Sequence, residues 1–491
     1  MTAHPDAAKN TTGSDPKLGA PEQSLNAKAD AGLVVDDVQS QLNATRVNRI
    51  LQPTSLDAIQ AAVQVAQRED RAISIAGGRH AMGGQQFGSD SVLLDMSQFN
   101  RVVEFDPIRG QIEVQSGIEW PELIDYLNRE QLGQTNQWAI KEKQTGVDRV
   151  SLGGSLASNV HGRGLQFPPM INDVESFLLV DAFGKLHTCS RSENSELFSL
   201  AVGGYGLFGI IAHVTLRLVP RTKVQRIVDI IAVKDLLPEV EKRIQQGFVY
   251  GDCQYSTDLE TEAGSHAGVL ACYRPVDNTT PIVEDQLQLS DNDWAQLYTL
   301  ARTNKKLAYE TYSQYYLSTS GQVYWSDLHQ LAGNFDAYRE AVDVQRGTEM
   351  ITEAYVAKDA FLPFMAQVRE DFVQHAVDMT YGTIRFIERD DESFLAWAKE
   401  PSVCIVCNLH VVHTDEGKQK AAEDFRRIID RVIEHGGRFY LTYHRWAERR
   451  QVEICYPQFV AFLRLKRKYD PHERFQSEWY RHYKTMFADQ L

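Results

Sequence analysis

A glycine-rich stretch with an arginine and a histidine follows a short apolar run at residues 73–76. Gly77-Gly78 precedes Arg79 and His80, and a second pair, Gly83-Gly84, follows. Glycine is used where the backbone adopts positive φ or approaches a ligand closely, and a strand that ends in such a loop presents N–H groups to phosphate oxygens. An arginine there neutralises a phosphate, and a histidine among glycines keeps one face open. The pattern is also typical of a tight turn with a surface histidine, so both interpretations stand at this point.

A second glycine-rich segment, at residues 144–164, places small residues where a ligand could lie against the backbone. Gly153-Gly154 opens a run of small residues that extends to Ser158, a composition that suits the start of a helix on which a flat or charged ligand rests. Small residues here are equally typical of close packing between a helix and a sheet. His161-Gly162 follows, and this histidine is either a ligand contact or a buried histidine of the core.

A third segment contains Gly204, Gly206 and Gly209, which match the spacing GxGxxG of nicotinamide-binding loops. In that fingerprint a strand precedes the glycines and a helix follows them. Here the order is reversed, because a helical pattern at Ser192–Leu200 precedes and a strand pattern at Ile210–Val219 follows. The sequence therefore argues against a Rossmann-type site at this position.

Short helices and strands alternate around these loops. Pro53-Thr54 opens a helix in which Thr54 and Asp57 match a capping box. A hairpin is expected from Val102–Phe105 and Ile112–Gln115, and another helix begins near Pro121. The glycine-rich loops are thus expected at the ends of short elements of an α and β fold.

Longer helices and broader apolar strands begin near residue 223. In the run 402–413, Cys404, Cys407, His410 and His413 recur every third residue. The run is β-branched and apolar, which indicates a strand, and residues three apart on a strand face opposite sides. These four side chains therefore cannot share one tetrahedral metal, and no metal site is expected. Alternate residues share one face, which could line a cavity: Cys404, Val406, Asn408 and His410.

A charged residue also interrupts the apolar strand pattern Tyr381–Ile387. Thr383, Arg385 and Ile387 share one face, and a charge inside an apolar strand is either paired or functional. Farther along, the pattern predicts a helix from Gly417 to about Glu434 and a strand at Arg438–His444.

Composition limits the classes of function. The 491 residues exceed one typical core, so two or more domains are expected. Lys and Arg total 51 against 66 Asp and Glu, a net charge of -15, which argues against nucleic acid as the main partner. No apolar run approaches the roughly 18 residues of a transmembrane helix, and no signal peptide is expected. Six cysteines in a chain of this length do not indicate a disulfide framework. We expect a cytoplasmic protein with a mobile tail at residues 1–32.

The three glycine-rich segments, in this order and spacing, resemble the vanillyl-alcohol oxidase/para-cresol methylhydroxylase (PCMH-type) family of FAD-dependent oxidoreductases. The resemblance rests on Gly77–His80 with Gly84, on Val150–Gly162 and on Gly203–Ile211, and it is dense over about residues 45–220. It implies an α+β, two-domain PCMH-type FAD-binding fold, with a cap domain of antiparallel sheet and helices over the isoalloxazine ring. The implied division is a tail at 1–32, an FAD-binding domain at 33–222, a substrate domain at 223–436 and a C-terminal segment at 437–491 that returns to the FAD domain.

The resemblance also implies which residues hold FAD. The loop at 77–81 would bind the pyrophosphate, and His80 matches the position that many members bond covalently to the flavin 8α-methyl. His161 would lie under the ring system near the substrate. The implied cofactor-binding residues are Gly77, Gly78, Arg79, His80, Ala81, Gly84, Gln85, Ser116, Gly117, Gly146, Val150, Ser151, Gly153, Gly154, Ala157, His161, Gly162, Gly209 and Ile211.

Within the cap, the strands resemble those of alditol-oxidase-like and decaprenylphosphoryl-ribose-oxidase-like members. Arg385 and His410 match substrate-side positions there, and Tyr443, followed by His444, stands where those relatives have a lysine. Tyr443 is then either a hydrogen-bond donor or general base, or an aromatic ring packed on the flavin. Val160 stands where several oxidases have a small residue beside the oxygen path, which favours a dehydrogenase.

Together these features predict an FAD-dependent oxidoreductase that oxidises a hydroxyl-bearing small molecule, such as an alcohol, polyol or sugar, by hydride transfer to flavin N5. Tyr443, His444 or His410 would take the hydroxyl proton, and Arg385 and Asn408 would bind polar groups of the substrate. Oxygen or another acceptor would reoxidise the flavin. Two alternatives remain open: a non-catalytic flavin-binding protein that acts with a partner, and an FAD-dependent reductase of C=C bonds.

Overall fold

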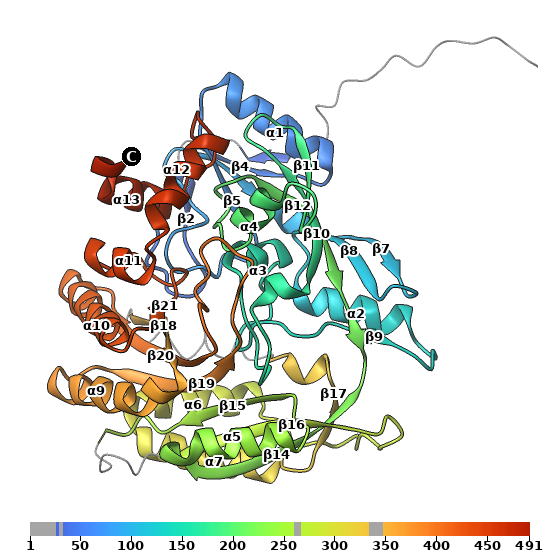
Figure 1. Ribbon diagram of the computed structural model, residues 1–491, viewed down its shortest axis with the longest axis vertical. Coiled ribbons are helices and arrows are strands. Elements are labelled where there is room, and N and C mark those ends of the chain that lie inside the picture. Colours follow the sequence, from blue (N-terminus) through green and yellow to red (C-terminus); the bar gives the residue numbers. More distant parts are fainter. Residues whose placement is uncertain (1–25, 29–32, 260–266, 333–346) are drawn as a thin grey trace, which may run out of the picture.

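The computed structural model describes residues 26–28, 33–259, 267–332 and 347–491 (Figure 1). The tail expected at residues 1–32 lies outside these residues, except for β1 (Asn26–Lys28), which pairs antiparallel with β4 (Arg49–Gln52). No helix among the described residues has both the length and the apolar character needed to cross a membrane. The mixture of helices and antiparallel sheets confirms the α+β class.

A four-stranded sheet, in the order β1-β4-β6-β5, carries the first glycine-rich loop. The loop leaves β5 (Ile73–Ala76), which runs parallel to β6 (Val92–Asp95). Helix α1 (Leu56–Arg68) covers this sheet through apolar residues such as Ile59 and Val63. Its N-cap is Ser55, whose hydroxyl accepts from the N–H of Ala58 at 3.2 Å, so the expected cap at Thr54 was wrong by one residue. A short antiparallel pair lies beside this sheet: β2 (Leu33–Val35) and β3 (Thr45–Val47).

A five-stranded antiparallel sheet carries the second and third glycine-rich segments. Its order is β11-β10-β12-β8-β7, and its strands are β7 (Val102–Asp106), β8 (Gln111–Gln115), β10 (Val174–Val180), β11 (Leu186–Ser190) and β12 (Ile210–Arg217). The accompanying helices are α2 (Trp120–Glu130), α3 (Leu152–Ser158) and α4 (Ser195–Ala201), and β9 (Trp138–Ala139) pairs with β13 (Val219–Pro220). Helix α4 precedes and β12 follows the third segment, which confirms the reversed order that argued against a Rossmann site.

An eight-stranded sheet forms the other part of the molecule, in the order β17-β14-β16-β15-β19-β20-β18-β21. Every adjacent pair is antiparallel. The strands are β14 (Lys223–Ala232), β15 (Tyr250–Tyr255), β16 (Ala267–Val276), β17 (Val323–Trp325), β18 (Gly347–Ala357), β19 (Met379–Ile387), β20 (Ser402–Val412) and β21 (Arg438–Phe439).

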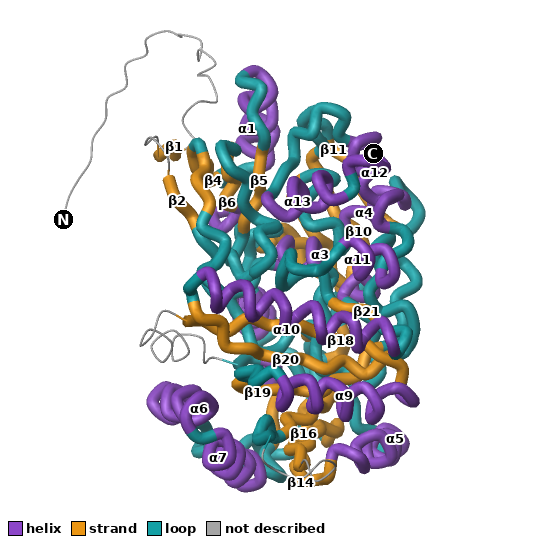
Figure 2. Tube along the Cα trace, turned by 90° about the vertical axis from the view of Figure 1, so that its left-hand side faces the viewer, coloured by secondary structure: helices purple, strands orange, loops and turns teal. Residues whose placement is uncertain are grey.

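Different helices cover the two faces of this sheet (Figure 2). Helices α5 (Leu236–Gln245), α9 (Phe361–Gln374) and α10 (Asp415–Glu434) cover one face. On the other face, α7 (Lys305–Ser318), which follows α6 (Asp291–Thr303), contacts Val228, Val269 and Ala271 through Tyr309, Tyr312 and Tyr316. Val269 belongs to a row of cross-strand partners that also contains Gln254, Thr383, Val406 and Glu353. The face under α7 is therefore also the face that carries Glu353.

The last helices lie beside the first sheet, as the red and blue ends of Figure 1 show. They are α11 (Arg449–Cys455), α12 (Phe459–Tyr469) and α13 (Glu478–Met486). Phe475 forms a parallel bridge with Ile73, and the Trp479 ring lies 4.7 Å from that of Tyr205. The strand expected at Arg438–His444 is limited to β21, because from Tyr440 onward the chain leaves the sheet edge and passes along the cavity described next.

Candidate active site

A cavity of about 880 Å³ lies between the glycine-rich loops and the α7 face of the eight-stranded sheet. Its lining joins residues from all three glycine-rich segments with residues from β14, β15, β18, β19 and β20 and from the chain after β21. The volume lies within the range usual for small-molecule and cofactor sites.

The first wall of the cavity consists largely of bare backbone. A Cβ at Gly78 would lie 2.2 Å from the carbonyl oxygen of Arg149, and a Cβ at Gly77 would lie 1.9 Å from Ser151 Oγ. Arg79 adopts φ of 60°, a conformation that is costly for a non-glycine residue and is concentrated at functional sites. Its guanidinium pairs with Asp95 at 3.0 Å, so its charge is compensated within the protein.

His80 lies in this wall beside the second glycine-rich segment. Burial lowers the pKa of His80 from 6.5 to about 4, although a hydrogen bond with the Arg149 backbone and the charge of Asp37 act in the opposite direction. The imidazole is therefore neutral at physiological pH, the form in which a ring nitrogen has a lone pair for bond formation.

Helix α3 continues the same wall. Ser151 caps the helix by accepting from the Gly154 N–H at 3.3 Å, and a Cβ at Gly153 would lie 2.8 Å from the Cβ of Ser116. Gly146, at φ of 88°, has open space where its Cβ would be. The N–H groups of Leu152, Gly153 and Gly154 are bonded within the protein, so this part of the wall offers small side chains to a flat group.

Most of the cofactor residues implied by the sequence line the cavity. These are Gly77, Gly78, Arg79, His80, Ala81, Gln85, Ser116, Gly146, Val150, Ser151, Gly153, Gly154, Ala157, His161, Gly209 and Ile211. Gly84, Gly117 and Gly162 are outside the lining and are closely packed instead. A Cβ at Gly117 would lie 1.9 Å from the Met96 carbonyl, and one at Gly162 would lie 2.6 Å from Glu142 Oε2.

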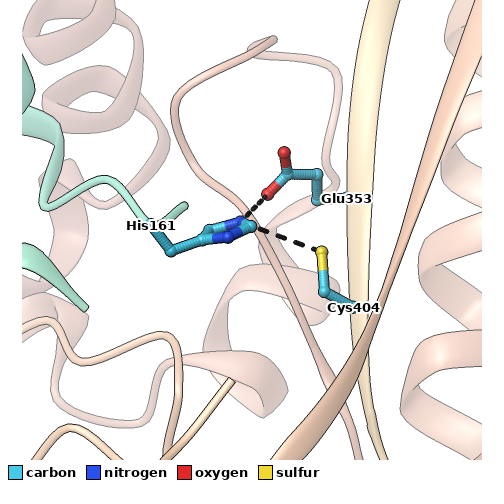
Figure 3. Close-up of side chains that lie close together, drawn as sticks. All are labelled: His161, Glu353 and Cys404. Carbon is cyan, nitrogen blue, oxygen red and sulfur yellow. Dashed lines mark hydrogen bonds and ion pairs between the residues drawn. The ribbon is translucent and has the colours of Figure 1, made fainter. Parts of the chain in front are cut away.

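The opposite wall is centred on a buried carboxylate, Glu353 of β18. His161 Nε2 lies 3.0 Å from Glu353 Oε2, and Figure 3 shows this carboxylate and the Cys404 side chain on the same side of the imidazole. Nδ1 of His161 lies 3.1 Å from the Gly162 carbonyl. Both ring nitrogens of His161 therefore lie within hydrogen-bond distance of an oxygen of the protein.

The charge of Glu353 is stabilised by its surroundings. Burial opposes the charged form, but His161 and Arg385 outweigh it and lower the pKa of this carboxyl to about 2. The Tyr355 hydroxyl donates to Oε2, and the Tyr443 hydroxyl donates to Oε1 at 2.9 Å. Glu353 is therefore an ionised acceptor of several hydrogen bonds.

Cys404 completes the close group of side chains in Figure 3. Its sulfur lies 3.8 Å from His161 Nε2, and the ligand atoms of His161, Glu353 and Cys404 lie within 4.8 Å of one another. Burial raises the pKa of the Cys404 thiol well above its ordinary value, so the thiol retains its proton. With His161 and Glu353 already bonded to each other, we interpret the group as a hydrogen-bond network.

Tyr443 lines the cavity, but its environment does not suit a general base acting alone. Burial and the charge of Glu353 raise the pKa of Tyr443 well above its ordinary value. The phenol is therefore neutral and donates its proton toward the carboxylate.

Arg385 also lines the cavity from β19. Its Nε is buried and has no hydrogen-bond partner among the described residues. A guanidinium with an unused buried donor is suited to a ligand oxygen, since an unsatisfied buried donor costs free energy.

Three residues expected to be catalytic lie outside the lining. His410 is bonded to Glu349 at 3.0 Å and to Arg302 at 3.1 Å. Asn408 is buried in the sheet, opposite Ile351. His444 is packed against Phe425, and burial lowers its pKa to about 3. Their positions assign them to the core and to a neighbouring network.

Glu353 was not identified from the sequence. The run 347–357 is apolar apart from threonines and two acids, Glu349 and Glu353. The argument that singled out Arg385, a charge inside an apolar strand, applies equally to Glu353 and could have found it.

Comparisons with known proteins agree with this cavity. Residues 47–190 match the family model described as an FAD binding domain. L-gulonolactone oxidase of Bos taurus is 26% identical over 195 residues, which are 40% of this chain and 42% of that protein. D-arabinono-1,4-lactone oxidase of Debaryomyces hansenii is 28% identical over 38% of this chain and 35% of its own length. L-galactono-1,4-lactone dehydrogenase 2 of Oryza sativa subsp. japonica is 32% identical over 36% of this chain and 29% of its own length. The chain thus spans less than half the length of each of these relatives.

Residues 47–190 are thus similar to an FAD binding domain, and FAD is the cofactor that this match indicates. The first wall fits this cofactor, since positions 77, 78 and 153 leave no room for a side chain and present backbone to the cavity.

Proposed function

We propose that the protein oxidises a hydroxyl-bearing carbon of a small, sugar-derived molecule such as a polyol, sugar or lactone. One observation carries the proposal: an ionised Glu353 is hydrogen-bonded to Tyr443, and both line the same cavity as the FAD-binding loops. The relatives named for aldonolactone oxidation and dehydrogenation support a sugar-derived substrate.

The chemistry divides between cofactor and protein. FAD, when bound, accepts the hydride from the substrate carbon. We assign the accompanying proton to a relay, in which Tyr443 Oη takes the hydroxyl proton while its own proton passes to Glu353 Oε1. Because Tyr443 is neutral and already bonded to Glu353 at 2.9 Å, this relay needs no rearrangement of the protein.

Arg385 has two roles in this proposal. Its charge helps to keep Glu353 ionised, and its unpartnered Nε donates to an oxygen of the substrate. His161 holds Glu353 from the other side, so that the carboxylate keeps its orientation toward Tyr443.

We further propose that His80 tethers the cofactor. An imidazole nitrogen of His80 would be bonded to the flavin 8α-methyl, and the two electrons and two protons released when this bond forms would pass to the electron acceptor. The neutral state of His80 and its place in the first wall support this assignment. The acceptor is oxygen or another oxidant, and the domain bounds 33–222, 223–436 and 437–491 are part of the same proposal.

The decisive experiment is an anaerobic titration of the purified holoprotein with L-gulono-1,4-lactone, L-galactono-1,4-lactone, D-arabinono-1,4-lactone and simple polyols. We expect one class to bleach the flavin absorbance rapidly and without added nicotinamide. If none bleached it while NADPH did, the protein would be a reductase. If neither did, the protein would be a flavin-binding protein without this activity.

A further inference from the structure

The cavity extends well beyond the Glu353–Tyr443 pair into a chamber between α7 and the eight-stranded sheet. We define the arginine chamber by Arg163, Arg226, Asp252, His329, Tyr316 and Tyr324, all of which line the cavity. The mechanism proposed above uses none of these residues.

Two guanidinium groups converge in this chamber. Arg163 Nη1 donates to the phenolic oxygen of Tyr273 at 3.3 Å, and Arg226 Nε donates to the same oxygen at 3.0 Å. Two like charges that share one acceptor repel each other, and bringing them together costs free energy unless negative charge compensates.

The compensation among the described residues is incomplete. Asp252 Oδ2 lies 3.7 Å from Arg163 Nε and is the one carboxylate that the described residues contribute to the chamber's lining. Arg226 is held by neutral groups, namely Thr319 and the rings of Tyr273, Tyr316 and Tyr324, the last with its centroid 4.7 Å away. Burial and the two arginines hold the pKa of His329 well below its ordinary value, so this imidazole is neutral. The chamber therefore carries excess positive charge inside a protein whose net charge is -15.

We propose that the arginine chamber binds an acidic group, a phosphate or a carboxylate, at the end of the substrate remote from the reacting carbon. Guanidinium groups bind both anions through paired hydrogen bonds. The tyrosine rings around Arg226 provide flat apolar surfaces next to the anion. This inference rests on the proposed function, because it names the substrate class of the same cavity.

The sheet order sets the length of such a substrate. Arg226 lies on β14 and Glu353 on β18, with β16, β15, β19 and β20 between them. Strands in a sheet are about 4.8 Å apart, so these two strands are roughly 24 Å apart. Arg163 lies between the two ends, since it pairs with Asp252 of β15. A substrate that contacts both Tyr443 and Arg226 is therefore longer than a single lactone ring.

Binding of small probes to the holoprotein tests the chamber directly. Phenyl phosphate and benzoate each carry an aromatic ring and an anion, and phenol is their neutral counterpart. Isothermal titration should show that at least one anion binds more tightly than phenol, and the tighter anion identifies the acidic group. Anions that bind no better than phenol would overturn the inference.

Variants locate the binding. Arg226→Gln should weaken binding of the preferred anion by roughly tenfold or more, whereas Arg226→Lys should retain part of it. Arg274→Gln is the matched control, because Arg274 is exposed on the neighbouring strand and lies outside the cavity lining. Equal losses in the two glutamine variants, or no loss in either, would contradict the assignment.

The folding of each variant is checked separately, because Arg226→Gln removes a hydrogen-bonded charge from the interior. Flavin content and thermal unfolding are compared with those of the wild-type protein. The comparison of anions with phenol in the wild-type protein tests the inference even if a variant fails to fold.

The two proposals fail in different ways. If neutral lactones or polyols reduce the flavin and anions do not bind, the proposed function stands and the chamber inference is wrong. If anions bind through Arg226 but no hydroxyl compound reduces the flavin, the chamber binds an anion and the proposed function is wrong.

Discussion

The two walls of the cavity are built from different parts of the polypeptide. The wall of the glycine-rich loops is formed mainly by backbone and small side chains, with Gly77, Gly78 and Gly153 pressed against their neighbours. The wall of the eight-stranded sheet is formed by charged and aromatic side chains such as Glu353, Arg385 and Tyr443. A backbone wall recognises its ligand by shape and N–H groups, and it is sensitive to added atoms. A side-chain wall is sensitive to lost head groups. Mutations in the first wall should therefore weaken cofactor binding, whereas mutations in the second should slow turnover.

An atom added to the backbone wall is expected to weaken cofactor binding. In Gly78→Ala, the new methyl group would lie 2.2 Å from the Arg149 carbonyl, so the loops at 77–81 and 149–154 must separate. Overpacking of this kind costs about 1–3 kcal/mol, which would weaken FAD binding by roughly tenfold to a hundredfold. Flavin content after purification measures this. A variant that retains full flavin and wild-type activity would show that the loops are not pressed together as described.

Removing head groups from the side-chain wall should leave FAD in place and stop turnover. Glu353→Gln and Tyr443→Phe each interrupt the proton relay, and loss of such a group slows the reaction by roughly 10²–10⁴-fold. Rapid-reaction measurement of flavin reduction with the substrate found by titration reports this step. Tyr483→Phe is the control, because the Tyr483 hydroxyl is buried in the core without a hydrogen-bond partner among the described residues. If Tyr443→Phe reduced the flavin as fast as the control variant, Tyr443 would not be part of the relay.

An intermediate effect is expected at His80, the one side chain of the backbone wall to which we assign bond formation. His80→Ala should fold normally and bind FAD, but acid denaturation should release all of its flavin, whereas the wild-type protein retains it. The absorbance of the precipitated protein and its intact mass distinguish retained flavin from released flavin. If both proteins released their flavin, His80 would line the loop without forming a bond to the cofactor. If the variant failed to fold, His80 would be a structural residue.

The smallest effect concerns His444, which lies behind the side-chain wall in the core. Its pKa is lowered from 6.5 to about 3 by burial, so between these values the unfolded chain binds a proton that the folded chain does not. The free energy of unfolding is therefore not reduced by His444 above pH 6.5, and it decreases as the pH falls from 6.5 toward 3. His444→Gln should reduce the slope of unfolding free energy in this window by about 1.4 kcal/mol per pH unit. Denaturant unfolding between about pH 4 and pH 7 measures it, and an unchanged slope would show that His444 is protonated in the folded protein.

The walls also differ in how far the sequence reveals them. Glycine loops are local, so the segments at 77–84, 150–162 and 203–211 could be recognised in the sequence, and their resemblance to PCMH-type FAD-binding proteins implied the α+β class. The side-chain wall is assembled across strands far apart in the sequence. Arg385 was recognised as a charge in an apolar strand, but the same signal at Glu353 was missed, because nothing local to residues 347–357 indicates that His161 and Tyr443 meet there.

Local patterns were least informative where tertiary contacts decide the outcome. His410 and His444 shared features with catalytic histidines in the sequence, yet the first is bonded to Glu349 and the second is packed between aromatic rings. The strand expected at Arg438–His444 has the right composition, but only Arg438 and Phe439 form a strand paired with β18, and the Tyr440 N–H adds one bond to the Glu353 carbonyl. After them the chain supplies Tyr440, Thr442 and Tyr443 to the cavity instead.

The glycine-rich loop is fastened to the far end of the chain. The Gln85 amide donates to the carbonyls of Leu441 and Thr442, positions 356 and 357 residues later, and Phe475 adds a bridge to Ile73. When only the FAD-binding segment has been synthesised, the later residues that line its cavity are therefore not yet present. The contacts that hold this loop in place can therefore all form only after the chain has been synthesised past residue 475.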